Sequence, residues 1–317
     1  MAKGVIGTSG AHVSNTSQDV FIPELWSDDV IAAYKTNLVL AQYVTKIGHK
    51  GKKGDTLHIP VPTRGSVTAK TSEQQVQVQS NVETKVSLTI DKHYEYSRII
   101  EDITSVQAIE SFRAFYTDDA GFALATQVDD DLFALGEGLQ GGTVGGSGAA
   151  LWETAVIGSN GSTAYNGATS NAAALADAGI RKMIQTLDDA DVPQMNRALI
   201  IPPVERNTLM GIARFTEQAF VGDVGGANTI RNGMIGQIYG IDVVVSSNCP
   251  SITSTDAAAA RVGLMLHKDA LAFIEQMSVR SQTQYKQEWL GDLFTADTIY
   301  GVGELRDNAG VAFVVPA

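Results

Sequence analysis

Few residues of this 317-residue chain have the types and spacing that catalysis needs. The sequence contains neither a G-x-S-x-G nucleophile elbow nor a G-x-x-x-x-G-K-[ST] phosphate loop. Cys249 is the only cysteine, and it would act as a nucleophile only if folding brought a histidine to it, so we expect a small buried or half-buried thiol. The histidines lack the paired spacing that is typical of a zinc site: His12, His49, His58, His93 and His267.

Two motifs match ligand-binding patterns by letter but lack the context that binding requires. Residues 136–141 read GEGLQG, yet the dinucleotide pattern must leave a strand and open a helix, whereas this run follows a predicted helix. Asp188, Asp189 and Asp191 lack EF-hand spacing, and calcium needs about 6 to 8 converging oxygens, so we expect a solvated helix end. Other acidic runs on predicted helices are expected to be exposed charges: 28–29, 118–119 and 129–131. We therefore predict no catalytic residue, no cofactor and no metal site.

The composition argues against several classes of function. A net charge of -12 disfavours broad nucleic-acid binding, because lysine and arginine carry the affinity for phosphates, and the basic run at 49–53 is expected to be a solvated turn. The chain contains no apolar run of about 18 residues, the length of a membrane span. Residues 1–20 lack the apolar core of a secretory signal and are expected to form a polar arm. A single cysteine excludes an internal disulfide and suits a reducing cytoplasm.

A long helix over 104–135 is the strongest structural prediction. Thr104 with Gln107 forms a capping-box signal at its start, and Gly136 marks its end. At about 1.5 Å per residue such a helix is longer than a compact small domain, and Gly121 is a candidate for a bend. Its apolar residues recur every three or four positions: Val106, Ile109, Phe112, Tyr116, Ala120, Leu124, Val128, Leu132 and Leu135.

A long two-stranded hairpin is predicted over 52–98. Residues alternate between apolar and polar from Asp55, and Pro60 and Pro62 favour an edge position, while 63–75 reads as a polar tip. A two-stranded ribbon is marginal alone and exposes both edges, so we infer that it lies across a neighbouring copy of the chain. The alternative is an ordinary hairpin within a larger sheet of the same chain. The predicted contact residues are these hairpin positions together with the anchor of the N-terminal arm: Trp26, Val76, Val78, Val82, Val86, Leu88 and Ile90.

The remaining pattern predicts one more helix near the start and a mixed α/β region towards the end. Ser27 caps a helix that extends to about Val44, and the stretch 136–171, rich in glycine and serine, reads as a boundary segment. Residues 172–260 alternate between helices and strands: a helix at 172–190, a strand at 197–201, a helix at 204–215 and a strand at 241–246. The last part is expected to consist of strands at 262–266, 279–288, 299–305 and 310–315, a short helix or strand at 271–277, and a turn at 289–298.

This order of parts resembles the major capsid proteins of tailed bacteriophages, whose fold is shared with bacterial encapsulin shells. The local matches are the anchor at 21–26, the run 51–62, the LDDADVP…R…IIPP pattern at 187–202, the strand region 236–246 and the closing segment 295–315. These patterns look closest to podovirus-type heads. The resemblance implies an α+β tailed-phage major capsid fold with an N-terminal arm, an extended β-hairpin loop, a long spine helix in a peripheral domain and an α/β axial domain.

The resemblance also implies a domain division and a set of partners. The expected parts are 1–51 (N-terminal arm and anchor helix), 52–98 (hairpin loop), 99–171 (peripheral domain), 172–260 (axial domain) and 261–317 (return strands to both domains). The chain would assemble as hexamers and pentamers into an icosahedral shell around double-stranded DNA, and its acidity would keep the inner wall from trapping that DNA. Portal and scaffolding proteins, and a decoration or cement protein, are the expected partners, with synthesis in the bacterial cytoplasm. The alternatives are an encapsulin-like nanocompartment and, more remotely, an enzyme built on the α/β lobe.

Overall fold

The structure is a computed structural model that describes residues 40–49, 54–61, 65–76, 78, 83–102, 112–141, 161, 165, 172–212, 236–252 and 260–317. The predictions for the N-terminal arm, for Trp26 and for the helix start at Ser27 lie outside the described residues, as does the predicted helix start at Thr104. The predicted helix does not continue to Val44: Leu40–Gln42 is a short 3-10 turn (η1), and a strand begins at Thr45.

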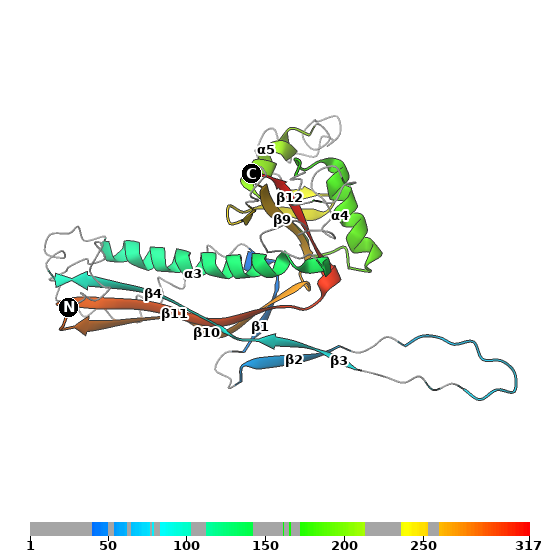
Figure 1. The fold of residues 1–317 in the computed structure, drawn as a ribbon, viewed down its shortest axis with the longest axis horizontal. Helices are drawn as coiled ribbons and strands as arrows, with labels where there is room; N and C mark the ends of the chain where they lie inside the picture. Colours follow the sequence, from blue (N-terminus) through cyan, green and yellow to red (C-terminus); the bar gives the residue numbers. More distant parts are fainter. Residues whose placement is uncertain are drawn as a thin grey trace.

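A four-stranded sheet with one long helix along its face forms the elongated part of the molecule (Figure 1). Strand β1 pairs parallel with β10, and the other two pairs are antiparallel. In sheet order the strands are β1 (Thr45–Gly48), β10 (Leu271–Lys286), β11 (Gly291–Glu304) and β4 (Lys92–Glu101). The predicted turn at 289–298 is wrong, because only 287–290 form a turn and β11 begins at Gly291.

The long helix is α3 (Phe112–Gly136), and it ends at the predicted glycine. Its predicted apolar stripe is confirmed within the described residues, where Ala120, Leu124, Val128 and Leu132 are buried. This stripe contributes to a buried core that also includes Phe294 and Tyr300 of β11 and Phe273 of β10.

The acidic runs of α3 are not the uniformly exposed charges that the sequence suggested. The Asp129 carboxylate is buried and accepts the Leu40 N–H at 3.2 Å, so it holds the chain at η1. Asp131 accepts the Tyr300 hydroxyl at 2.8 Å, and Asp119 accepts the Tyr96 hydroxyl at 2.6 Å. Hydrogen bonds from the sheet therefore stabilise two of these carboxylates and one from η1 stabilises the third, which ties α3 to the segments that it covers.

A six-stranded sheet forms the second part of the molecule, with its strands in the order β12-β9-β5-β7-β6 and β8 paired to β9 (Figure 1). Strands β5 and β7 are parallel, and the other pairs are antiparallel. Helix α4 (Asp177–Asp189) precedes β5, and α5 (Pro203–Met210) follows it, ending earlier than predicted. The strands are β5 (Arg197–Ile201), β6 (Gln237–Ile238), β7 (Ile241–Val245), β8 (Ser251–Ile252), β9 (Ala260–His267) and β12 (Gly310–Pro316).

Three chain segments connect the two sheets, and we call them together the junction. They are residues 136–141, which include the 3-10 turn η2 (Leu139–Gly141), the turn 268–270, and residues 305–309, which include η3 (Asp307–Ala309). The junction is packed rather than open, because one continuous buried core includes residues from both sheets.

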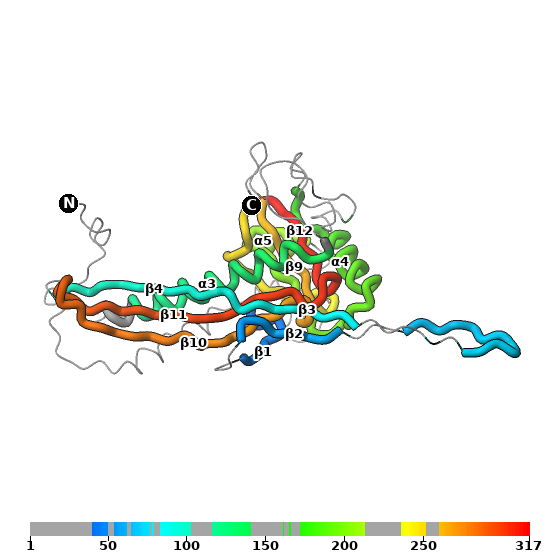
Figure 2. Tube along the Cα trace, turned by 60° about the horizontal axis from the view of Figure 1, so that its bottom comes forward, coloured from blue at the N-terminus to red at the C-terminus, as the bar shows by residue number. Residues whose placement is uncertain are grey.

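A two-stranded hairpin extends from the end of the four-stranded sheet nearest the junction (Figure 2). It consists of β2 (Thr56–Val61) and β3 (Thr84–Thr89), which pair antiparallel from Thr56 opposite Thr89 to Val61 opposite Thr84. The predicted hairpin of 52–98 is too long at its second strand, because β4 starts at Lys92 and pairs with β11 instead. The alternation of apolar and polar residues continues through this change of partner, so it could not mark the end of the hairpin.

Candidate intersubunit surface

The hairpin tip exposes apolar side chains far from the rest of the chain. Residues 65–76 and 78 have no regular strand structure and extend beyond β2 and β3 (Figure 2). Val67, Val76 and Val78 are 99%, 70% and 93% exposed. A small turn shapes the end of the loop, where the Thr71 hydroxyl donates to the Gln74 side chain at 2.8 Å. These exposed valines make the projecting loop a candidate for contact with another chain.

The base of the hairpin, in contrast, is fixed to its own chain. Leu88 and Ile90 are buried, and they form a small apolar cluster with Ala272 and Ile274 of β10. The Ile90 N–H donates to the Asp55 carbonyl oxygen at 2.7 Å, which joins the two strands where they leave the sheet. The loop therefore projects from a rigid support.

These contacts divide the residues that the sequence proposed for a contact between copies. Leu88 and Ile90 are buried against their own chain, because β3 lies against the four-stranded sheet before it projects, and their contact with a neighbouring copy stays a prediction. Val86 is partly buried in the same cluster. Val76 and Val78 remain available to a neighbour, while Trp26 and Val82 lie outside the described residues.

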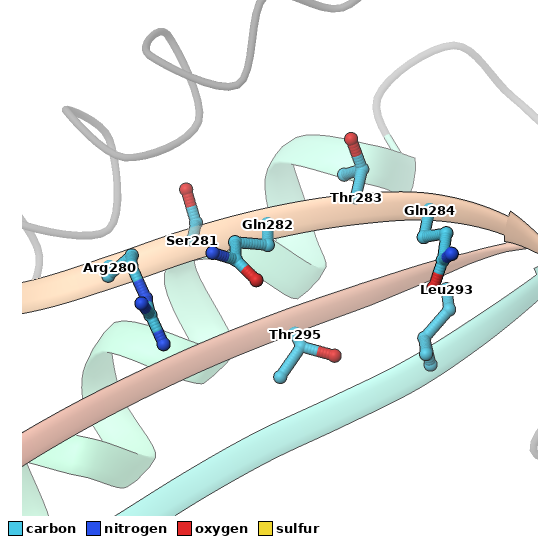
Figure 3. A pocket seen from close by; sticks show the side chains of 7 residues that line it. All are labelled: Arg280, Ser281, Gln282, Thr283, Gln284, Leu293 and Thr295. Carbon is cyan, nitrogen blue, oxygen red and sulfur yellow. The ribbon is translucent and has the colours of Figure 1, made fainter.

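Polar side chains of β10 and β11 line a shallow groove on the four-stranded sheet (Figure 3). It has a volume of about 680 Å³ and is lined by Arg280, Ser281, Gln282, Thr283, Gln284, Leu293 and Thr295. The Arg280 guanidinium donates to both oxygens of Asp297, at 3.1 and 2.8 Å, and His93 Nε2 lies 3.3 Å from the same carboxylate. These groups can donate and accept hydrogen bonds, so the groove presents polar groups to anything that lies on it.

Cys249 and Glu205 are both buried, and the surroundings of each indicate a role in the fold rather than in chemistry. Burial raises the pKa of the Cys249 thiol to about 12, as expected for an unreactive buried cysteine. Burial also raises the pKa of Glu205, whose Oε2 accepts the Leu175 N–H at 2.8 Å and so attaches α5 to the segment before α4. Within the described ranges, no three His, Cys, Asp or Glu side chains gather as a metal site, and no helix is long and apolar enough to cross a membrane.

The GEGLQG run has the structural role that its context suggested. Gly136 ends α3, and Gln140 adopts a positive φ of 60° within η2, so the run turns the chain towards the six-stranded sheet. Sequence reasoning missed that Glu137 within it is buried in the junction, being only 7% exposed. A glutamate between two glycines gives no periodic signal from which its burial could be inferred.

Arg197 accounts for the LDDADVP…R…IIPP pattern at 187–202, because it bonds to several residues of that segment. This role was not predicted from the sequence. Its side chain is 2% exposed, and its guanidinium donates to Asp188 Oδ1 at 2.6 Å and to the Val192 carbonyl oxygen at 2.7 Å. It also donates to the Pro193 carbonyl oxygen at 2.9 Å. The expected solvated helix end is therefore corrected for Asp188, which binds an arginine. An arginine at the start of an apolar strand was the available signal.

Comparison with known proteins gives a consistent answer. The sequence model of a family described as "Phage capsid protein" matches residues 102–312. A structure from Mycobacterium phage Che8 has 23% identity and a TM-score of 0.66, covering 87% of this chain and 90% of that one. The capsid structure of cyanophage P-SCSP1u has 16% identity and the same TM-score, covering 88% of each chain.

A virus-like particle from Pyrococcus furiosus has the same fold at 10% identity and a TM-score of 0.53, covering 92% of this chain and 98% of that one. No curated protein matches the sequence. The structural matches show the fold, which is the predicted α+β capsid fold with its spine helix, and the family match covers most of the chain.

Proposed function

Because the chain belongs to the phage capsid protein family, we propose that its copies join head to tail, with the hairpin tip of one copy lying on the next. As a member of this family it is a structural component of the virion rather than an enzyme. It is a major capsid protein, whose copies build the icosahedral head shell of a tailed phage. What we propose is the contact by which neighbouring copies bind one another.

The observation that carries the proposal is the exposed apolar tip on a fixed base. Val76 and Val78 are held beyond the end of the molecule by strands that are anchored through Leu88. The turn that joins β10 to β11 lies at the opposite end of the molecule from the hairpin (Figures 1 and 2). A tip that projects beyond its own chain cannot be covered by that chain, and repeated head-to-tail contacts close into rings when the rotation allows it.

The proposal extends to the composition of the shell and its partners. Hexameric and pentameric rings would tile the shell, and portal and scaffolding proteins, with a decoration or cement protein, would complete it. The division into arm, hairpin, peripheral domain, axial domain and return strands, at the boundaries predicted from sequence, belongs to the same proposal. So does the assignment to podovirus-type heads, which the sequence patterns at 187–202 and 236–246 support.

Particle formation by the purified chain tests the proposal. The expressed protein is fractionated on a sucrose gradient, and the fast-sedimenting material is imaged by negative-stain electron microscopy. We expect closed isometric shells built from rings. A protein that stays monomeric over a hundredfold range of concentration, with and without a crowding agent, would contradict head-to-tail assembly.

The contents of native particles distinguish the two shell functions. A phage head contains double-stranded DNA that resists added nuclease, whereas an encapsulin-like compartment contains a cargo protein and no genome. The net charge of -12 favours the first, because an acidic wall does not hold packaged DNA in place.

A further inference from the structure

The junction holds the two sheets together with little free space. The N–H groups of Leu305 and Arg306 both donate to the Ala270 carbonyl oxygen, at 2.9 and 3.3 Å, so two of its three segments are bonded to each other. The third segment, the end of α3, packs tightly, since a Cβ on Gly136 would lie 2.5 Å from Leu264 Cδ1 of β9. A change in the volume or charge of a side chain here therefore affects how the two sheets meet.

Glu137 lies between the end of α3 and η2, in a segment of the junction, and its side chain is ionisable although the residue is buried. Among the described residues, no side chain forms an ion pair with its carboxyl group, and no donor hydrogen-bonds to it. Burial alone raises the pKa of Glu137 from 4.5 to about 7. An ionised carboxylate in this position would be largely removed from water, since only 7% of the residue is exposed, and no ion pair with a described residue would stabilise it.

The elements around the end of α3 bring more negative than positive charge to the junction. Strand β12 and η1 contain no ionisable side chain, and η3 contributes Asp307. Burial and the neighbouring Asp307 raise the pKa of Glu304 on β11. Among the cations of these elements, Arg306 donates to the Ala190 carbonyl oxygen, Arg261 to the carbonyl oxygens of Ser247 and Cys249, and His267 lies beside Asp269. Lys268, in the turn 268–270, is exposed. On its own helix, the nearest acids are Asp129, Asp130 and Asp131.

We propose that Glu137 is a proton-dependent lock on the junction: while its carboxyl group is protonated, the end of α3 stays seated between the two sheets, and loss of the proton loosens it. Because the pKa of Glu137 is higher in the closed junction than in an opened one, protonation favours the closed form. That contribution is complete below about pH 4.5, declines as the pH rises to about 7, and does not change further above it.

In a shell, this lock would let pH change how firmly the angle between the two sheets is held, and with it the curvature of each ring. That consequence rests on the proposed function, whereas the lock itself is a property of the single chain. The experiment therefore uses the unassembled protein, so a failure of shell assembly and a failure of the lock give different results.

Hydrogen exchange of the full-length chain between pH 4.5 and 8.5, divided by the intrinsic exchange rate at each pH, measures opening of the junction. We expect protection at 136–141 and 305–309 to fall by up to about tenfold per pH unit as the pH rises to 7, and then to level off. Strand β5 serves as an internal reference for global unfolding.

Two variants remove the titration in different ways. Glu137→Gln keeps a neutral polar group, and Glu137→Met replaces it with an apolar chain of similar length, so one remains informative if the other fails to fold. In either, protection of the junction should be independent of pH after subtraction of the β5 change. Asp118→Asn, which removes an exposed acid from the same helix, should retain the wild-type profile. A flat profile in the wild-type protein, or an unchanged slope in Glu137→Gln, would overturn the lock.

Discussion

The guanidinium of Arg197 donates to the carboxylate of Asp188 at 2.6 Å, and this bond joins the end of α4 to the start of β5. Arg197 is buried and also donates to two backbone carbonyl groups of the connecting turn, whereas 40% of the Asp188 side chain is exposed. Arg197 and Asp188 therefore contribute unequally to the stability of the turn. The arginine stabilises the whole turn, and the aspartate stabilises only the arginine.

Arg197→Met should lower the free energy of unfolding by about 3 kcal/mol, because it leaves buried carbonyl groups without a donor. Asp188→Asn should lower it by no more than about 1 kcal/mol, since the side chain is partly hydrated and the other bonds of Arg197 remain. Urea denaturation followed by circular dichroism measures both. Equal losses in the two variants would show that the ion pair, rather than the carbonyl contacts, stabilises the turn.

Val76→Asp with Val78→Asp should prevent shells while the isolated chain remains folded. Both side chains are exposed in the single chain, so the substitutions cost little until a neighbour would have to bury two carboxylates. Gradient sedimentation and electron microscopy measure assembly, and circular dichroism measures folding. The matched control, Val76→Ile with Val78→Ile, keeps the surface apolar and should assemble. If the aspartate variant formed normal particles, the hairpin tip would not be part of the contact between copies.

Measuring the stability of Leu88→Ala and Val78→Ala tests whether the base of the hairpin is anchored while its tip is not. Leu88 is 2% exposed and packs on β10, so its truncation should lower the free energy of unfolding by about 2 to 4 kcal/mol. Val78 is 93% exposed, and its truncation should change the value by less than about 0.5 kcal/mol. If Leu88→Ala were neutral in the unassembled chain, the hairpin base would not be anchored as described.

Gly263→Ala should destabilise the six-stranded sheet. A Cβ at this position would meet the Phe313 ring and lie 2.9 Å from the Ile200 carbonyl oxygen, which cannot move without disturbing β5. We expect a loss of about 1 to 3 kcal/mol. Gly48→Ala, where a Cβ meets nothing within 4 Å, is the control and should be nearly neutral. Adding Phe313→Leu to Gly263→Ala should recover only part of the loss, because the carbonyl contact remains.

The Cys249 thiol should react slowly with iodoacetamide in the folded chain. Its pKa of about 12 leaves little thiolate at pH 8, and the side chain is 3% exposed. Alkylation should be at least about a hundredfold slower than in the urea-unfolded chain. Mass spectrometry after timed quenching measures both rates, and equal rates would place the thiol at the surface.

The sequence allowed prediction of the elements whose apolar pattern is local. The end of α3 at Gly136, the buried strand β5 and the strand β7 follow from periodicity and from glycine or proline signals. Strand β11 was partly missed, because Asp297 and Thr298 interrupt its pattern although both are buried. Asp297 is bound by Arg280, and Thr298 donates to the Met277 carbonyl oxygen. Polar residues that are satisfied by a distant strand look like a turn in the sequence.

The candidate contact surface was predicted in part for the same reason. Alternation identified the hairpin, but it gave no means to decide that β4 pairs with β11 or that Leu88 packs on β10. Asp129 is a similar case, because its partner, the Leu40 N–H, lies 89 residues away. Pairing between distant segments is decided by the whole fold, and single-sequence patterns do not contain it.

A subunit whose tip projects at one end has a direction, and this has a consequence for mixtures. A copy without a working tip can still receive its neighbour's loop, but it offers nothing to the copy after it. Every such copy that joins a growing ring therefore stops growth at that point. A small fraction of chains without a working tip should therefore inhibit assembly of the normal protein. The inhibition should be larger than their share of the mixture.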